Sequence, residues 1–341
     1  MKYFFSFLIY LLAFNLTNSF AQVKIAVLSD FTNKGAFYGE HTRNGAILAL
    51  EEINQKEEKL EILFSDTKMD TKIATTEALK FVNIDQVDAV YSEFSPTSIA
   101  IASTIKNKDV LMLYSGAAQS PLETNKNAYK TFVDFIDGCK LLARKFKDLG
   151  INKIGYIGRP SETSELCHIG IKSIFKEKDI FDFELVDGST LYSETIKLKK
   201  NNVDLVFSVN YEPEFHLMLK TFKHFKYFPK IGAFKDTITD NIKNEFRNDF
   251  FKNINYFEIN IDNQEFLNRY YKKFPKASKT SSTAAALAYL HIKQLYGAIT
   301  SCPNNIECQK KYMDNLGEDK DFYFSGFKNR VANFTINLGK F

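Results

Sequence analysis

The sequence predicts an α/β protein made of two lobes, each built around a doubly wound parallel sheet. Its 341 residues are enough for two separate hydrophobic cores. Short apolar runs alternate with segments of helical spacing from Gln22 onward. This series breaks at residues 130–138 and a second series of the same kind follows, which favours two similar lobes over one large sheet.

The first series supplies the strands and helices of lobe 1. Its apolar runs lack a clean two-residue alternation, as expected for strands that helices cover on both faces. The predicted strands are 23–30, 60–66, 87–94 and 110–116, and the predicted helices are 43–55, 71–83 and 98–107.

The second series forms lobe 2 and then returns to lobe 1. The predicted strands are 153–159, 181–188, 203–210, 230–235 and 254–260, the helices are 139–150, 165–178, 193–202, 212–225, 264–274 and 282–299, and residues 322–339 have strand character again. We assign 22–134 and 261–315 to lobe 1, and 135–260 and 316–341 to lobe 2 and the hinge crossovers. No low-complexity linker separates the lobes, so ordered crossover strands are expected to join them.

The first 21 residues have the pattern of an export signal. Lys2 precedes the apolar segment 3–14, and the small residues Ser19 and Ala21 flank Phe20 at a cleavage site. We expect cleavage after Ala21, and an uncleaved anchor is the alternative.

Composition narrows the possible partners and cofactors. The net charge of +4 has no basic run behind it, so nucleic acid is not an expected partner. In an exported chain, Cys302 and Cys308 are predicted to form a local disulfide, while Cys139 and Cys167 either pair or stay buried thiols. The scattered histidines predict no metal site. No catalytic motif is present, so neither a catalytic residue nor a cofactor is expected.

Small and polar residues mark the ends of two neighbouring strands, where open parallel sheets bind ligands. Ser95-Pro96 and Ser120-Pro121 are typical helix starts, with a capping hydroxyl before a proline. Gly116, Ala117 and Ala118 leave room for a ligand to reach the backbone beside Ser95 and Gln119. A ligand carboxylate suits such helix starts.

Aromatic residues lie at the same strand ends. Tyr38, Phe94, Tyr211 and Phe234 predict a cleft that covers an apolar group.

Four segments together resemble the branched-chain amino-acid-binding family of type I periplasmic binding proteins. They are "VKIAVLSDFTNKGAFYGEHTRNGAILALEEIN", "SEFSPTSIAIAS", "VLMLYSGAAQSPLE" and "FLNRYYKKF" with the following "SSTAAALAYLHIKQLYGAI". The resemblance implies a periplasmic protein whose two lobes, joined by three crossovers, enclose a small-molecule ligand. It also implies a monomer that delivers this ligand to an ABC permease in the inner membrane.

The resemblance assigns roles to individual positions. Tyr38 and Tyr211 match aromatic residues that cover the ligand, Ser95 matches the serine that holds its carboxylate, and Ala117 matches a main-chain contact. Gln119 stands where the family usually has a threonine.

Phe234 stands where amino-acid binders have a glutamate that pairs the ligand's ammonium group. Glu212 or Asp236 is the alternative partner. A buried ammonium without a carboxylate is costly, so we expect a small apolar carboxylate or amide rather than an amino acid. A ligand-sensing subunit of the same fold and a periplasmic hydrolase remain as other functions.

Overall fold

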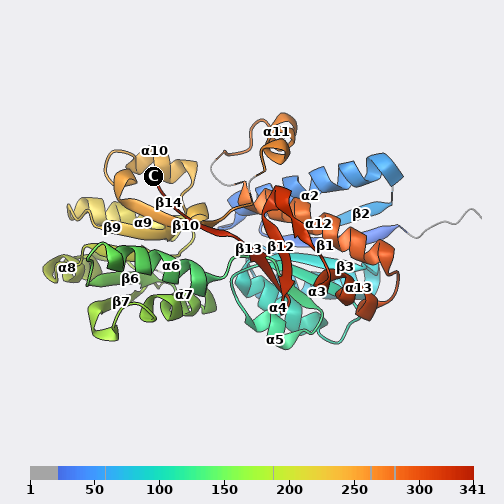
Figure 1. Ribbon diagram of the computed structural model, residues 1–341, viewed down its shortest axis with the longest axis horizontal. Coiled ribbons are helices and arrows are strands. Elements are labelled where there is room, and N and C mark those ends of the chain that lie inside the picture. Colours follow the sequence, from blue (N-terminus) through green and yellow to red (C-terminus); the bar gives the residue numbers. More distant parts are fainter. Residues whose placement is uncertain (1–21, 58, 187, 262, 280–281) are drawn as a thin grey trace, which may run out of the picture.

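The structure is a computed structural model that describes residues 22–57, 59–186, 188–261, 263–279 and 282–341. The predicted export signal lies outside these residues. Two lobes lie side by side along the longest axis, and the chain passes between them in three places (Figure 1). The predicted class, two parallel-sheet α/β lobes, is confirmed.

Lobe 1 contains an eight-stranded sheet in the order β11-β12-β13-β5-β4-β3-β1-β2. Strands β2, β1, β3, β4 and β5 run parallel, and β11, β12 and β13 form an antiparallel extension at one edge. The strands are β1 Val23–Ser29, β2 Leu60–Asp66, β3 Ala89–Glu93, β4 Leu111–Ser115, β5 Ala128–Lys130, β11 Glu318–Asp319, β12 Phe324–Lys328 and β13 Val331–Phe334. The helices are α2 Ala36–Glu57, α3 Thr71–Lys80, η1 Phe81–Asp85, α4 Ser95–Ile105, α5 Ser120–Thr124, α11 Gln264–Lys273, α12 Thr283–Ser301, α13 Ile306–Asp314 and η5 Lys320–Phe322.

Lobe 2 contains a six-stranded sheet in the order β14-β10-β9-β8-β6-β7, in which only the edge strand β14 is antiparallel among the described pairs. The strands are β6 Ile154–Gly158, β7 Ile180–Glu184, β8 Leu205–Ser208, β9 Lys230–Phe234, β10 Ile254–Ile259 and β14 Ile336–Lys340. The helices are α6 Phe135–Asp148, α7 Glu162–Lys172, η2 Glu177–Asp179, α8 Tyr192–Lys200, α9 Glu212–His224, η3 Lys235–Thr237, α10 Asp240–Phe246 and η4 Phe251–Asn253.

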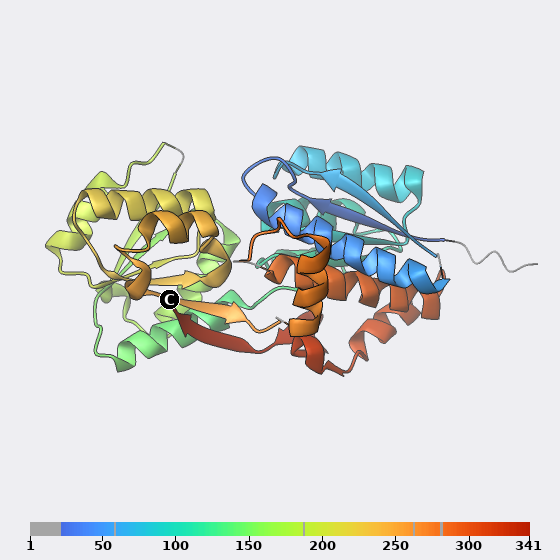
Figure 2. The same ribbon diagram turned by 90° about the horizontal axis from the view of Figure 1, so that it is seen from above.

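Helices cover both faces of each sheet, which explains why the strand sequences are apolar without alternation. In lobe 1, α2 and α12 pack on one face and α3, α4 and α5 on the other. In lobe 2, α6 and α7 pack on one face and α8, α9 and α10 on the other. Figure 2 shows the same two layered lobes from above.

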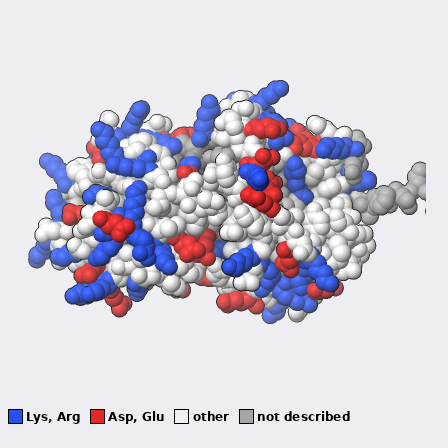
Figure 3. All heavy atoms as spheres, viewed as in Figure 1, with Lys and Arg blue, Asp and Glu red and all other residues white. Residues whose placement is uncertain are grey.

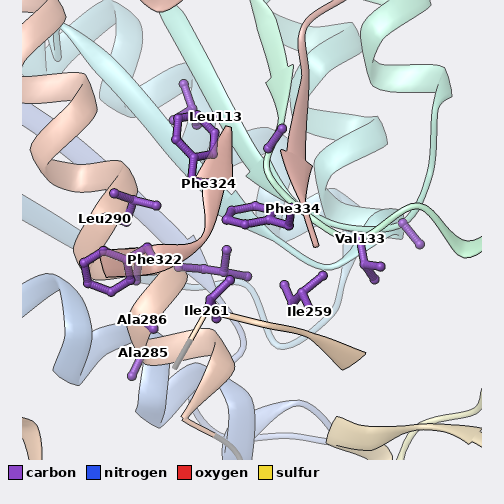
Figure 4. Close-up of a cluster of buried hydrophobic side chains, with 14 of the residues drawn as sticks. Leu113, Val133, Ile259, Ile261, Ala285, Ala286, Leu290, Phe322, Phe324 and Phe334 are labelled. Carbon is purple, nitrogen blue, oxygen red and sulfur yellow. The ribbon is translucent and has the colours of Figure 1, made fainter. Parts of the chain in front are cut away.

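Two of the three crossovers place side chains in the hydrophobic core. The three crossovers link β5 to α6, β10 to α11 and β13 to β14. Figure 4 shows crossover residues Val133 and Ile261 in one buried cluster with Ile259, Phe334 and Leu113 of the sheets. These two crossovers are therefore ordered parts of the fold, as the absence of a linker sequence indicated.

The position of the C-terminal strands differs from the predicted lobe boundary. Residues 316–341 were assigned to lobe 2 and the crossovers, but β11, β12 and β13 join the sheet of lobe 1 and only β14 joins lobe 2. Apolar spacing identifies strands but does not say which sheet edge they join.

Both cysteine pairs form disulfides. The predicted Cys302–Cys308 bond is confirmed and links the end of α12 to α13. Cys139 and Cys167, which the sequence left open, also pair, with a Cα–Cα distance of 5.3 Å, and join α6 to α7.

Charged residues are mixed over the molecular surface. On the face shown in Figure 3, lysine and arginine lie among aspartate and glutamate on both lobes. Within the described residues, no helix has the length and apolar character needed to cross a membrane.

Candidate ligand-binding site

A cavity of about 400 Å³ lies between the lobes, at the carboxyl ends of both sheets. In each sheet the strand order reverses direction at one point, between β1 and β3 in lobe 1 and between β6 and β8 in lobe 2. Tyr38 follows β1, Ser95 follows β3, Arg159 follows β6 and Tyr211 follows β8, and all four line the cavity. The two switch points thus face one another across a single cavity.

Six of the seven predicted site residues line this cavity. They are Tyr38, Phe94, Ser95, Ala117, Tyr211 and Phe234. The seventh, Gln119, is not among the lining residues. Its backbone N–H donates to the Glu162 carboxylate of lobe 2, with an N–O distance of 2.5 Å.

Glu162 fills the place where the sequence suggested a ligand carboxylate. Its Oε1 also accepts from the Ser120 backbone N–H at 3.0 Å, and its Oε2 accepts from the Ser120 hydroxyl at 2.6 Å. A side chain of lobe 2 therefore satisfies the start of α5 in lobe 1. Sequence spacing could not reveal this contact because Glu162 is 42 residues from Ser120.

Neither serine caps its own helix, contrary to the predicted capping role. The N-cap positions are Phe94 and Gln119, without a side-chain cap hydrogen bond. The Ser95 hydroxyl instead accepts from the Ala118 N–H at 3.1 Å and lies 3.4 Å from the Thr163 hydroxyl of lobe 2. Both serine hydroxyls serve contacts around the cleft.

Phe94 has a strained backbone at the centre of the cavity wall. Its φ of +68° is unusual for a bulky residue, and such outliers concentrate at functional sites. Gly35 makes room for the ring, because a Cβ there would lie 2.5 Å from Phe94 Cζ. At Gly116 a Cβ would lie 3.1 Å from the Ser95 backbone nitrogen, so the small residues let two strand ends approach closely.

Aromatic rings form two groups around the cavity. The Phe94 ring stands edge-to-face between Tyr38 and Tyr211, with centroids 6.2 Å and 5.9 Å away. Nearer the hinge, Phe132 and Phe135 pack on Phe234, each with a centroid distance of 5.4 Å. The sequence interpretation missed Phe132 and Phe135, which lie where the chain first crosses between lobes.

Two buried carboxyl groups also line the cavity. Glu93 of lobe 1 is 4% exposed and Asp236 of lobe 2 is 5% exposed. Burial raises the pKa of Glu93 to about 7, the hydrogen bond from the Ser29 hydroxyl opposes this rise, and the charges of Asp30 and Asp236 add to it. The sequence interpretation missed Glu93, although it lies near the end of the predicted strand 87–94 and is the last residue of β3.

The other charged residues near the cleft differ in whether they line the cavity. Asp236 lines the cavity, whereas Glu212 does not, and its Oε1 accepts from Asn241 Nδ2 at 2.9 Å. Arg159 lines the cavity with its Nε donating to Glu214 Oε1 at 2.8 Å. An acid is therefore available for a ligand, although not at position 234.

Further contacts hold the lobes together on the side of Asp236. The Tyr38 hydroxyl donates to the Asp236 backbone carbonyl at 3.0 Å, and the Thr283 hydroxyl donates to the Asp236 carboxylate at 3.1 Å. The Ser278 hydroxyl donates to Asp240 at 2.5 Å. Burial raises the pKa of Tyr38, so its hydroxyl keeps the proton that it donates.

The described residues contain no group of three or more His, Cys, Asp or Glu arranged to hold a metal ion. Two α/β lobes that together line an aromatic cavity and are joined by three crossovers are typical of a protein that encloses a small molecule.

Comparison with known families agrees with this class. A family model described as "Periplasmic binding protein" matches residues 22–323. The chain belongs to this family of binding proteins, which is not a family of enzymes, and the resemblance noted in the sequence is confirmed.

Relatives with known names point in the same direction. A leucine-, isoleucine-, valine-, threonine- and alanine-binding protein of Pseudomonas aeruginosa is 29% identical over 221 residues, which cover 59% of this chain and 57% of the relative. A Leu/Ile/Val-binding protein of Escherichia coli is 26% identical over 215 residues, 58% of this chain and 57% of that protein. The match thus spans less than two thirds of either relative.

Solved structures share the fold over almost the whole chain. The isoleucine complex of the branched-chain amino acid transporter substrate binding protein LivJ from Streptococcus pneumoniae has a TM-score of 0.81 at 17% identity, covering 94% of this chain and 96% of that one. A solute binding protein of an ABC transporter from Rhodopseudomonas palustris, in complex with p-hydroxybenzoic acid, has a TM-score of 0.82 at 16% identity, covering 94% and 92%. At these identities the likeness concerns the fold.

Proposed function

We propose that this protein is a periplasmic receptor that captures a small organic ligand between its lobes and delivers it to an ABC importer. The observation that carries the proposal is the cavity itself. Residues of both lobes line it, and its volume of about 400 Å³ suits a small molecule. Six residues selected from sequence as ligand contacts, among them Ser95 and Tyr211, lie in its wall.

The relatives support the transport role. Both curated relatives are named as amino-acid-binding proteins, and two of the similar structures carry transporter names. Their bound ligands, isoleucine and p-hydroxybenzoic acid, are small molecules with an apolar or aromatic body. The aromatic groups around Phe94 and Phe234 suit a body of this kind.

The direct test is to identify the molecule that this protein carries. The protein is purified from periplasm, and native mass spectrometry compares its mass before and after mild denaturation. We expect a bound small molecule at near one equivalent, released unchanged. Ala117→Phe, which fills the cavity, should abolish the bound mass, whereas Ile169→Phe on the exposed face of α7 should retain it.

Transport requires a second measurement. Cells that lack the gene should take up the identified molecule more slowly than the parent strain. Equal uptake in the cells that lack the gene and in the parent strain would favour the sensor function. Conversion of the bound molecule into a product would favour the hydrolase function.

A further inference from the structure

We propose that the ligand presents a protonated amine to Glu93 and Asp236, and that it does not need a carboxylate group. The ligand class is then an organic amine with an apolar or aromatic body. This inference rests on the proposed receptor function and specifies the ligand of the same cavity.

Two buried acids line the cavity. Glu93 and Asp236 come from opposite lobes, and both line the cavity while being at least 95% buried. The two carboxyl groups border one cavity, and the charge of Asp236 adds to the rise in the pKa of Glu93, so their like charges destabilise each other. A cation between them would remove this repulsion, so the ligand would favour closure.

Aromatic rings lie beside these acids. Tyr38, Phe94 and Tyr211 form a continuous edge-to-face group at the same part of the wall. Aromatic faces attract organic cations, and the attraction strengthens when water is excluded. An acid pair flanked by aromatic rings favours an ammonium group over a carboxylate.

The charged residues of the cavity lining are mostly acidic. Across the described chain, Arg159 is the one lysine or arginine in the cavity wall, and its Nε already donates to Glu214. Glu93, Asp236 and Glu162 line the same cavity. A ligand carboxylate would meet three acids and one arginine that is already in an ion pair.

Glu162 occupies the hydrogen-bond donors at the start of α5. Its carboxylate accepts hydrogen bonds from the amides of Gln119 and Ser120 and from the Ser120 hydroxyl. These three donors would suit a ligand carboxylate. A carboxylate of the ligand would have to displace this side chain. A ligand without a carboxylate leaves these hydrogen bonds between the lobes intact.

The test uses ligands that share one body and differ in their charged groups. Calorimetry compares 2-phenylethylamine, phenylalanine and 3-phenylpropanoate, and then isopentylamine, leucine and 4-methylpentanoate. We expect each amine to bind at least as tightly as its amino acid and at least about tenfold more tightly than its carboxylate. Glu93→Gln and Asp236→Asn should each weaken amine binding about 10- to 100-fold, since a hydrogen bond to a charged group is lost.

The matched control is Glu184→Gln, the same chemical change at an exposed position of β7 in lobe 2, which should stay within about twofold. Tightest binding of a carboxylate, or unchanged amine affinity in Glu93→Gln, would overturn the inference and leave the receptor function standing. Failure of all six compounds to bind would also overturn it. The co-purified molecule would still test the receptor function separately.

Discussion

The parallel strands of the two lobes have the same order, but the lobes supply opposite hydrogen-bonding groups to the contacts between them. Lobe 1 supplies donors, namely the hydroxyls of Tyr38, Ser120, Ser278 and Thr283 and the N–H groups at the start of α5. Lobe 2 supplies acceptors, namely the carboxylates of Glu162, Asp236 and Asp240. This difference indicates that protein contacts, and not the ligand alone, stabilise the closed arrangement.

The largest expected effect is a difference between the lobes in the stability that each gains from its disulfide. The Cys139–Cys167 bond of lobe 2 joins residues 28 apart and the Cys302–Cys308 bond of lobe 1 joins residues 6 apart. Loop entropy predicts a loss of about 3–4 kcal/mol of unfolding free energy when the first is removed and about 2 kcal/mol for the second. Denaturant unfolding of the two double Cys→Ser variants measures this. Equal losses would show that loop closure does not set the contribution.

The next largest effect is expected when a hydrogen-bond acceptor of lobe 2 is removed. Glu162→Ala leaves the start of α5 without its three hydrogen bonds, so the closed form should become less populated and ligand affinity should fall about 10- to 100-fold. Electron–electron distance measurements between spin labels on the two lobes should report a wider separation. Glu165→Ala on the same helix, at an exposed position, is the control. Identical distances in both variants would contradict the role of Glu162.

A pH series examines the acid that lobe 1 contributes. The pKa of Glu93 is raised to about 7 by burial, so this carboxyl holds a proton at pH 6 and must release it before it can pair a cation. Amine affinity should therefore rise about tenfold from pH 6 to pH 8, as the ionised fraction grows. The titratable groups that interact electrostatically with Glu93 are Asp30 after β1, Tyr38 on α2, Tyr91 on β3, Tyr211 before α9 and Asp236 on η3. Glu93→Gln should flatten the profile, and a steep profile in that variant would assign the titration to another group.

The smallest effect is expected when one hydrogen-bond donor of lobe 1 is removed. Tyr38→Phe keeps the ring but loses the hydrogen bond to the Asp236 carbonyl, which is worth about 1 kcal/mol. Ligand affinity should fall about fivefold. Tyr323→Phe, at a half-exposed position, should leave it unchanged. A loss above about fiftyfold would mean that the hydroxyl also contacts the ligand.

Much of this site could be predicted from the sequence because strand ends are visible in it. Tyr38, Ser95 and Tyr211 were placed at the cavity because each follows an apolar run, and the carboxyl ends of parallel strands meet at one edge. Glu93 was missed because its strand is covered on both faces, so no alternation indicates where its side chain points. The contact of Glu162 with Ser120 was missed because it joins separate lobes.

The central claim is that the lobes close over a small ligand. Small-angle scattering tests it by comparing the protein alone with the protein bound to an amine whose binding calorimetry has shown. We expect a smaller radius of gyration on binding. We also expect a larger radius of gyration for ligand-free Glu162→Ala than for the unaltered protein. Superimposable curves with and without a bound ligand would contradict closure of the lobes as the mechanism of capture.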